Sequence, residues 1–414
     1  MNLIKTSFYA SIATVVTFIS GFIVTKFVAV KIGPSGIAYV GQFTNTVAIL
    51  TMIATGAITT GVVKYLAGYQ NDREKQASVI ATALKIILIC SFIVSLFVII
   101  ASNYLSNSAF RTREFWPVFV LYGIFLTILS LNTLFVSIFN GLKQIKKLTI
   151  INITGSLAGI IFTITFANFL GVTGVLIASN FTALIVFILN LWFLKDFKGL
   201  QWKPDFRIWD KKLVQLLFAF TLMTMTSGLL TPFTQLMIRG RIIENFSIAE
   251  AGYWQAVTRI SDYYLGFITT VLSIYYLPRL SEINEKQELR KEIFKGYKLI
   301  LPAVGIMAMV IWLLRSLIVH ILFTPEFMPM LPLFKYQLLG DFFKIGSWLV
   351  SFIMVSKALT KVFIMSEIGF SVTQITLSYY FIGHFGIIGA TYAFCINYAA
   401  YWIVMWFLMK KHFK

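Results

Sequence analysis

The chain consists almost entirely of consecutive runs of about 20 apolar residues. A helix of that length crosses the hydrocarbon core of a bilayer, where only helices and closed barrels satisfy their own backbone polar groups. With 58% hydrophobic and 12% charged residues, the composition also lies outside the soluble range. We therefore predict an all-α integral membrane protein of about twelve transmembrane helices. The expected spans are 8–30, 38–62, 79–101, 117–140, 148–168, 172–194, 213–238, 250–276, 297–319, 333–355, 361–381 and 386–408.

Basic residues are distributed unequally between the two sides of these spans. Cytoplasmic segments of membrane proteins collect Lys and Arg. The N-terminus, the even-to-odd connections and the C-terminus hold 24 of the 35 basic residues, whereas the odd-to-even connections hold six. Those six are Lys31, Arg111, Arg113, Arg239, Arg241 and Arg315. We predict that both termini are cytoplasmic, and that the net charge of +19 is a topology signal and not a sign of nucleic-acid binding.

Rare residue types recur at an offset of 215 residues, which indicates an internal duplication. The matches are Lys26 with Arg241, Lys64 with Arg279, Pro117 with Pro332, Lys146 with Lys361, Gly171 with Gly386, Gly174 with Gly389 and Lys195 with Lys410. Each half has an even number of spans, so both copies enter the membrane in the same direction. We predict a six-helix lobe at 1–195, a cytoplasmic linker at 196–212 and a second six-helix lobe at 213–414, arranged around a central cavity.

The eighth predicted span carries two charges near its middle. Arg259 and Asp262 are three residues apart, so they share one face of a helix with Gln255. A charge at the bilayer centre costs roughly 3 kcal/mol on insertion scales, so it faces a bundle interior or a wet cavity. One interpretation is a cavity-lining pair that binds a ligand. The other is an intrahelical ion pair that only fixes packing.

The tenth predicted span repeats this pattern with Asp341 and Lys344. Within all spans the basic residues outnumber the acidic ones. They are Lys26, Lys85, Arg259, Lys335 and Lys344 against Asp262, Asp341 and Glu367. A helix-bundle interior with a net positive charge suits an anionic ligand such as phosphate or pyrophosphate, because Lys and Arg bind these groups through charge-assisted hydrogen bonds.

Polar and aromatic residues of other spans join these charges as candidate site residues. The predicted cavity set is Arg259, Asp262, Asp341, Lys344, Lys26, Lys64, Gln42, Gln255 and Trp254. Candidates for ion coupling are Asp262, Asp341 and Glu367, and Pro232 is a candidate hinge with a static kink as the alternative. Uncharged stripes such as the one containing Gln42 also serve helix packing. We expect no cofactor and no metal site, because the cysteines and histidines do not cluster and no phosphate-binding glycine motif occurs.

Several stretches resemble the Wzx-type polysaccharide flippases of the multidrug/oligosaccharidyl-lipid/polysaccharide (MOP) exporter superfamily, the lipid III and O-antigen flippases above all. They are IGPSG at 32–36, VKYLAGY at 63–69, GYWQAVTRISDYYLGFIT at 252–269, YYLPRLSE at 275–282, LPAVG at 301–305 with IWLLR at 311–315, and YQLLGDFFKIGSW at 336–348. The resemblance runs end to end and implies a two-lobed, MATE-like fold. It also implies transport of an undecaprenyl-pyrophosphate-linked oligosaccharide across the inner membrane, alongside a polymerase and glycosyltransferases. Arg259 departs from the small residue that the resemblance implies there, which leaves the glycan open.

Two other functions are compatible with parts of the sequence. A cation-coupled small-molecule exporter has the same fold, but organic-cation substrates favour an acidic cavity. A membrane enzyme of glycan assembly presents a substantial external loop with catalytic residues, whereas the predicted external connections here are short. The sequence therefore favours a flippase over an enzyme.

Overall fold

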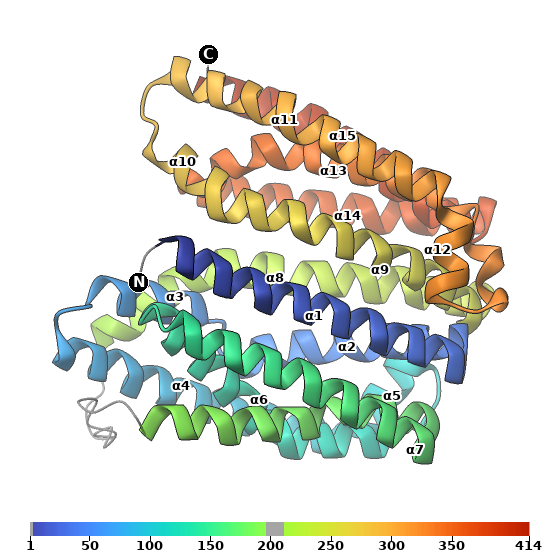
Figure 1. Cartoon of the computed structure of the whole chain (residues 1–414), viewed down its shortest axis with the longest axis horizontal. Helices are drawn as coiled ribbons and strands as arrows, with labels where there is room; N and C mark the ends of the chain where they lie inside the picture. Colours follow the sequence, from blue (N-terminus) through green and yellow to red (C-terminus); the bar gives the residue numbers. More distant parts are fainter. Residues whose placement is uncertain (1–2, 196–210, 414) are drawn as a thin grey trace. The chain divides into compact units, whose positions relative to one another are not determined.

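The computed structural model describes residues 3–195 and 211–413, and these contain helices and no β-strand (Figure 1). Every predicted span overlaps a long helix of the structure, and most of the spans lie entirely within a helix. In chain order the elements are α1 (Leu3–Ile32), α2 (Pro34–Ala54), α3 (Thr59–Gly68), α4 (Arg73–Ile100), α5 (Ser102–Phe110), α6 (Trp116–Gly141), α7 (Ile145–Lys195), α8 (Lys211–Asn245), α9 (Ile248–Val271), the π-helix η1 (Leu272–Tyr276), α10 (Leu277–Glu282), α11 (Lys286–Leu313), α12 (Arg315–Leu322), the 3-10 helix η2 (Pro325–Met330), α13 (Leu333–Ser356), α14 (Thr360–Phe385) and α15 (Ile388–Phe413).

Eight of the described helices are long and apolar enough to cross a membrane. They are α1, α2, α4, α6, α7, α11, α13 and α15. Three further long helices, α8, α9 and α14, coincide with predicted spans but fall outside this set. The all-α membrane fold predicted from the sequence is confirmed.

Helix α7 contains the fifth and sixth predicted spans in one 51-residue element. Its backbone leaves the helical region at Gly171, where φ is 56° and ψ is −132°. This left-handed φ favours glycine, because a side chain there meets the backbone. The predicted boundary between the two spans, after residue 168 and before residue 172, is therefore correct. The second predicted span is wrong in one detail, because α2 and α3 are separated by a turn in which Gly56 and Ala57 have positive φ.

The predicted duplication is visible in the turns. Gly386 begins the connection between α14 and α15 with φ of 70°, and it lies 215 residues after Gly171. Lys143 and Ala358, also 215 residues apart, have φ of 55° and 52°. The amide of the residue after each donates to a carbonyl five residues back, at 2.8 Å in both turns. These turns therefore follow the same backbone path at the spacing that the duplication predicts.

Contacts divide the chain into two compact units. Unit 1 comprises Met1–Lys31 and Gln42–Pro232, and unit 2 comprises Ile32–Gly41 and Phe233–Lys414. These differ from the predicted lobes in two stretches, since the start of α2 clusters with unit 2 and the first part of α8 with unit 1. Most of the predicted linker, 196–210, lies outside the described residues. The symmetric lobe boundaries stay a prediction.

Each unit has its own apolar core. In unit 1 the core joins α3, α4, α6 and α7 to the start of α8, through fully buried side chains such as Leu66, Ile87 and Leu134. In unit 2 it joins η1, α10, α11, α13 and α15, through Ile293, Leu349 and others. Figure 1 shows α11, α13 and α15 running side by side. Because α13 packs on both α9 and α15, its polar face is held inside unit 2.

Candidate functional site

Asp341 is the most deeply buried of the predicted charges. It lies on α13 and is fully inaccessible. The Tyr264 hydroxyl on α9 donates to its Oδ2 at 2.8 Å, and the Gln337 amide one turn earlier on α13 donates to its Oδ1 at 3.3 Å. Burying a carboxylate is costly unless its oxygens are hydrogen-bonded. The two donors fix the carboxylate between α9 and α13.

Lys344 lies one turn beyond Asp341 and is half-buried. Its Nζ lies over three aromatic rings, at 5.0 Å from the Trp348 centroid, 5.7 Å from Tyr398 and 5.9 Å from Phe394. Such cation–π contacts contribute about 0.5 to 2 kcal/mol each, more when water is excluded. Asp341 and Asp262 also act on this ammonium electrostatically. Three rings from α13 and α15 thus hold a cation next to a buried carboxylate.

Arg239 is a residue that the sequence placed wrongly. It was expected in an external connection, but α8 continues to Asn245 and the Arg239 side chain is fully buried in unit 2. Its Nη2 donates to Oε1 of Gln255, and its guanidinium lies 5.5 Å from the Trp254 ring centroid. Gly41 permits this packing, because a Cβ there would lie 2.7 Å from the same Gln255 oxygen. Gln255 and Trp254, both predicted cavity residues, therefore support a buried guanidinium.

Arg259 and Asp262 share one face of α9, as predicted, but do not form a direct ion pair within the described chain. Arg259 is half-buried and interacts electrostatically with Arg239, a like charge. Asp262 is exposed and interacts with both Lys344 and Arg259. An exposed carboxylate in the middle of a membrane helix needs water around it. This face of α9 therefore fits a wet surface better than a closed packing contact.

Unit 2 brings six of the predicted cavity residues onto α9 and α13. They are Trp254, Gln255, Arg259, Asp262, Asp341 and Lys344. With Arg239 the cluster holds three basic and two acidic side chains. Its net positive charge is suited to an anion, and its ring faces offer apolar contact. Among the described residues no group of three or more His, Cys, Asp or Glu could hold a metal ion.

Other predicted residues lie elsewhere. In unit 1, Lys26 on α1 and Lys64 on α3 are exposed, whereas Gln42 is buried and donates to the carbonyl of Ala109 at 2.8 Å. Glu367 on α14 is half-buried and interacts with Tyr401. Pro232 lies inside the continuous helix α8, where unit 1 ends and unit 2 begins. The roles proposed for these residues stay predictions.

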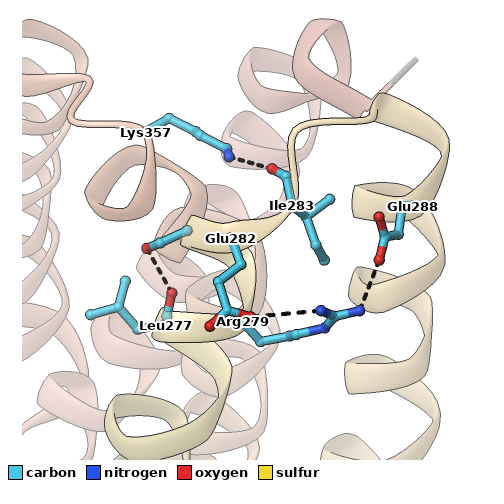
Figure 2. Close-up of polar contacts among 7 residues, drawn as sticks. Leu277, Arg279, Glu282, Ile283, Glu288 and Lys357 are labelled. Carbon is cyan, nitrogen blue, oxygen red and sulfur yellow. Dashed lines mark hydrogen bonds and ion pairs between the residues drawn. The ribbon is translucent and has the colours of Figure 1, made fainter.

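Arg279, which corresponds to Lys64 in the repeat, is held by acidic partners (Figure 2). Its Nη2 donates to Glu288 on α11 at 2.8 Å, and Glu282 lies one turn away on α10 at 3.7 Å. Lys357 donates to the carbonyl of Ile283 between these two helices. The Lys357 contact joins the α10–α11 connection to the end of α13. Arg279 therefore has a structural role, because its guanidinium is held by two carboxylates.

Comparisons with known proteins agree with this architecture. The chain matches the polysaccharide biosynthesis protein family over residues 3–284. It belongs to that family. It is 29% identical over 406 residues to the lipid III flippase of Escherichia coli K12 and equally to that of Shigella flexneri, covering 97% of this chain and 96% of each relative.

Solved structures with a similar fold are transporters of the MOP superfamily. An inward-facing multidrug resistance MATE family transporter matches with a TM-score of 0.82 and 14% identity, covering 96% of this chain and 94% of that one. An outward-facing one matches at 0.72 and 15% identity, covering 98% and 95%. A MOP transporter from Pyrococcus furiosus, described as having a binding pocket of reversed polarity, matches at 0.69 and 15% identity, covering 97% and 95%. At these identities the likeness shows the fold, so the chain has the multi-pass, all-helical fold of these membrane transporters.

Proposed function

We propose that this transporter moves an undecaprenyl-pyrophosphate-linked oligosaccharide from the cytoplasmic to the periplasmic leaflet of the inner membrane. The observation that carries the proposal is the net positive cluster on α8, α9 and α13, with Arg239, Arg259 and Lys344 as its cations. Guanidinium groups bind phosphate oxygens in a bidentate manner, so this cluster suits a diphosphate. The end-to-end similarity to two lipid III flippases supports a lipid-linked substrate.

The glycan is an O-antigen unit or a lipid III-like oligosaccharide. Trp348 and Tyr398 present ring faces beside Lys344, and sugar rings stack on such faces. Arg259 adds a cation that the resemblance to the lipid III group does not imply. A polymerase and glycosyltransferases of the same pathway are the expected partners, because they use and supply a lipid-linked glycan.

Transport proceeds by alternating access in this proposal, with Pro232 as a hinge. Pro232 removes one backbone hydrogen bond from α8 and permits a bend there. The division between the compact units falls at this residue, which supports the assignment. Asp262, Asp341 and Glu367 are the candidates for ion coupling, and Asp341 has the most defined partners among them.

Reconstitution provides the test of this function. Purified protein is placed in liposomes with a fluorescent undecaprenyl-pyrophosphate-linked oligosaccharide in one leaflet, and the labelled lipid reaching the other leaflet is quantified by a membrane-impermeant quencher. We expect transfer well above protein-free liposomes. A rate equal to that of protein-free liposomes, under proton and sodium gradients of both directions, would contradict the proposal. Uptake of an organic cation instead would favour the exporter.

Topology is a separate prediction. Arg239 and Arg241 lie inside α8 and not in an external connection. The predicted external connections therefore hold fewer than the six basic residues counted from the sequence. The difference in positive charge between the cytoplasmic and external connections is correspondingly greater. We expect a reporter that is active in the cytoplasm to work when fused after Lys414, and one that is active in the periplasm to work when inserted at Arg113 in the turn before α6. The opposite pair of activities would show that the orientation is reversed.

A further inference from the structure

A row of aromatic side chains joins α11 and α15 on unit 2. Tyr297 stacks on Trp402 with ring centroids 5.8 Å apart, and Phe294 meets Trp406 edge to face at 6.0 Å. The earlier residue of α11 contacts the later residue of α15. The two helices are therefore antiparallel. Figure 1 shows the chain end of α15 near the beginning of α11. The row lies outside the α9–α13 cluster described above.

The aromatic row forms the wall of an apolar groove of about 400 Å³. Its lining residues are Tyr297, Trp402, Ile403, Trp406 and Phe407. The Trp402 indole N–H donates to the Tyr297 hydroxyl at 2.8 Å, and that hydroxyl donates to the carbonyl of Gly346 at 2.8 Å. These two residues use their polar atoms within the protein, so they present ring carbons to the groove. Such a surface suits a hydrocarbon chain.

Basic side chains stand at one end of this groove. The guanidinium of Arg290 lies 5.7 Å from the Phe294 ring centroid, one turn before it on α11. Lys410 lies one turn after Trp406 on the same face of α15. Because the helices are antiparallel in this register, Arg290 and Lys410 come to the same level. This is the end predicted to face the cytoplasm, where the headgroups of anionic lipids attract basic side chains.

We propose that this groove binds one anionic glycerophospholipid of the surrounding bilayer, with its phosphate between Arg290 and Lys410 and an acyl chain along Trp402 and Trp406. An apolar groove that ends at two cations matches a molecule with an apolar chain and an anionic head. Only ring carbons of Tyr297 and Trp402 face the groove, so these rings contact the acyl chain, and the two cations bind the headgroup. The site is distinct from the transport cluster and does not depend on the identity of the transported glycan.

The test measures lipid binding by the full chain. Delipidated protein in neutral detergent is titrated with dioleoylphosphatidylglycerol or dioleoylphosphatidylcholine, and bound lipid is counted by native mass spectrometry. We expect phosphatidylglycerol to occupy one site with clear preference. Each basic group near an anionic headgroup contributes about 1 kcal/mol, so the double variant Arg290→Gln with Lys410→Gln should bind it about 30-fold more weakly. Equal binding of the two lipids by the unchanged protein would overturn the proposal.

Two matched controls separate a site from general attraction. Lys291→Gln with Lys411→Gln removes the same charge from neighbouring faces of α11 and α15, and it should leave the preference intact. Ile403→Phe fills the groove and should remove the bound lipid, whereas Val404→Phe adds one methylene more of bulk outside the lining and should not. An equal effect in either matched pair would contradict a defined site. Preferential retention of undecaprenyl phosphate over phosphatidylglycerol would likewise show that the occupant is wrong.

Discussion

Arg259→Gln is expected to lower transport of the lipid-linked glycan roughly 10- to 100-fold while leaving a normal amount of folded protein in the membrane. A hydrogen bond to a charged group contributes about 1.5 to 3 kcal/mol, which corresponds to this range. Folding should tolerate the change, because Arg259 forms no direct ion pair with Asp262 within the described chain and its neighbour Arg239 carries the same charge. Arg259→Lys should retain part of the activity.

A double variant distinguishes ligand binding from charge balance. If Arg259 only compensates Asp262, then Arg259→Gln with Asp262→Asn should restore transport, because both partners become neutral. We expect transport to stay low in the double variant. Periplasmic glycan, normalised to the protein in the membrane fraction, is the measurement. Wild-type transport by the double variant would refute the binding role of Arg259.

Arg315→Gln provides a matched control for the loss of charge. Arg315 is also half-buried, but its guanidinium lies within its own turn, 4.7 Å from the Trp312 ring centroid, and donates to the Trp312 carbonyl. Its neutralisation removes one positive charge without touching the α9–α13 cluster. Transport should stay within about twofold of the unchanged protein. A loss as large as that of Arg259→Gln would mean that total charge, and not the position of Arg259, governs transport.

The membrane fold follows from the sequence because hydrophobic length is a direct physical requirement of the bilayer. The break at Gly171 was predictable for a similar reason, since glycine is the residue that enters the left-handed region without a clash. The error at Arg239 had another cause. A basic, glycine-containing stretch was interpreted as the end of a span, although α8 continues past it. The Ser247 and Glu250 pattern marks where α9 begins, and Ser247 does cap it by accepting from the Glu250 amide at 3.1 Å.

The charged cluster was only partly predictable. Gln337, Asp341, Lys344 and Trp348 follow one another at helical intervals, so their common face on α13 could be deduced. The rings of Tyr398 on α15 and the hydroxyl of Tyr264 on α9 reach that face through long-range packing, which a single sequence does not encode in its spacing. The spacing of Arg259 and Asp262 was compatible with an ion pair or with two separate charges. Side-chain conformation decided between them.

Gly389→Ala is expected to destabilise the protein by about 3 kcal/mol or more. A Cβ at this position of α15 would lie 2.1 Å from the carbonyl oxygen of Phe381 in α14, so the backbones themselves must separate. The repeat makes the same prediction in unit 1. At Gly174 the Cβ would lie 2.0 Å from the carbonyl oxygen of Phe166, and both contacts span eight residues. The measurement is the thermal midpoint of purified protein by fluorescence-detected size-exclusion chromatography.

Each glycine has a control in its own unit. Gly369→Ala on α14 adds a Cβ that meets nothing within 4 Å, and Gly159→Ala on α7 meets only Thr182, at 3.9 Å or more. Both controls should leave the midpoint unchanged or raise it, because Ala favours a helix over Gly by about 1 kcal/mol. Because the added Cβ meets a carbonyl oxygen at nearly the same distance in both turns, Gly174→Ala and Gly389→Ala should lower the thermal midpoint by similar amounts. A variant at either position that is as stable as its control would show that the two helices do not pass so closely at that turn, and that the turn does not share the repeated backbone path.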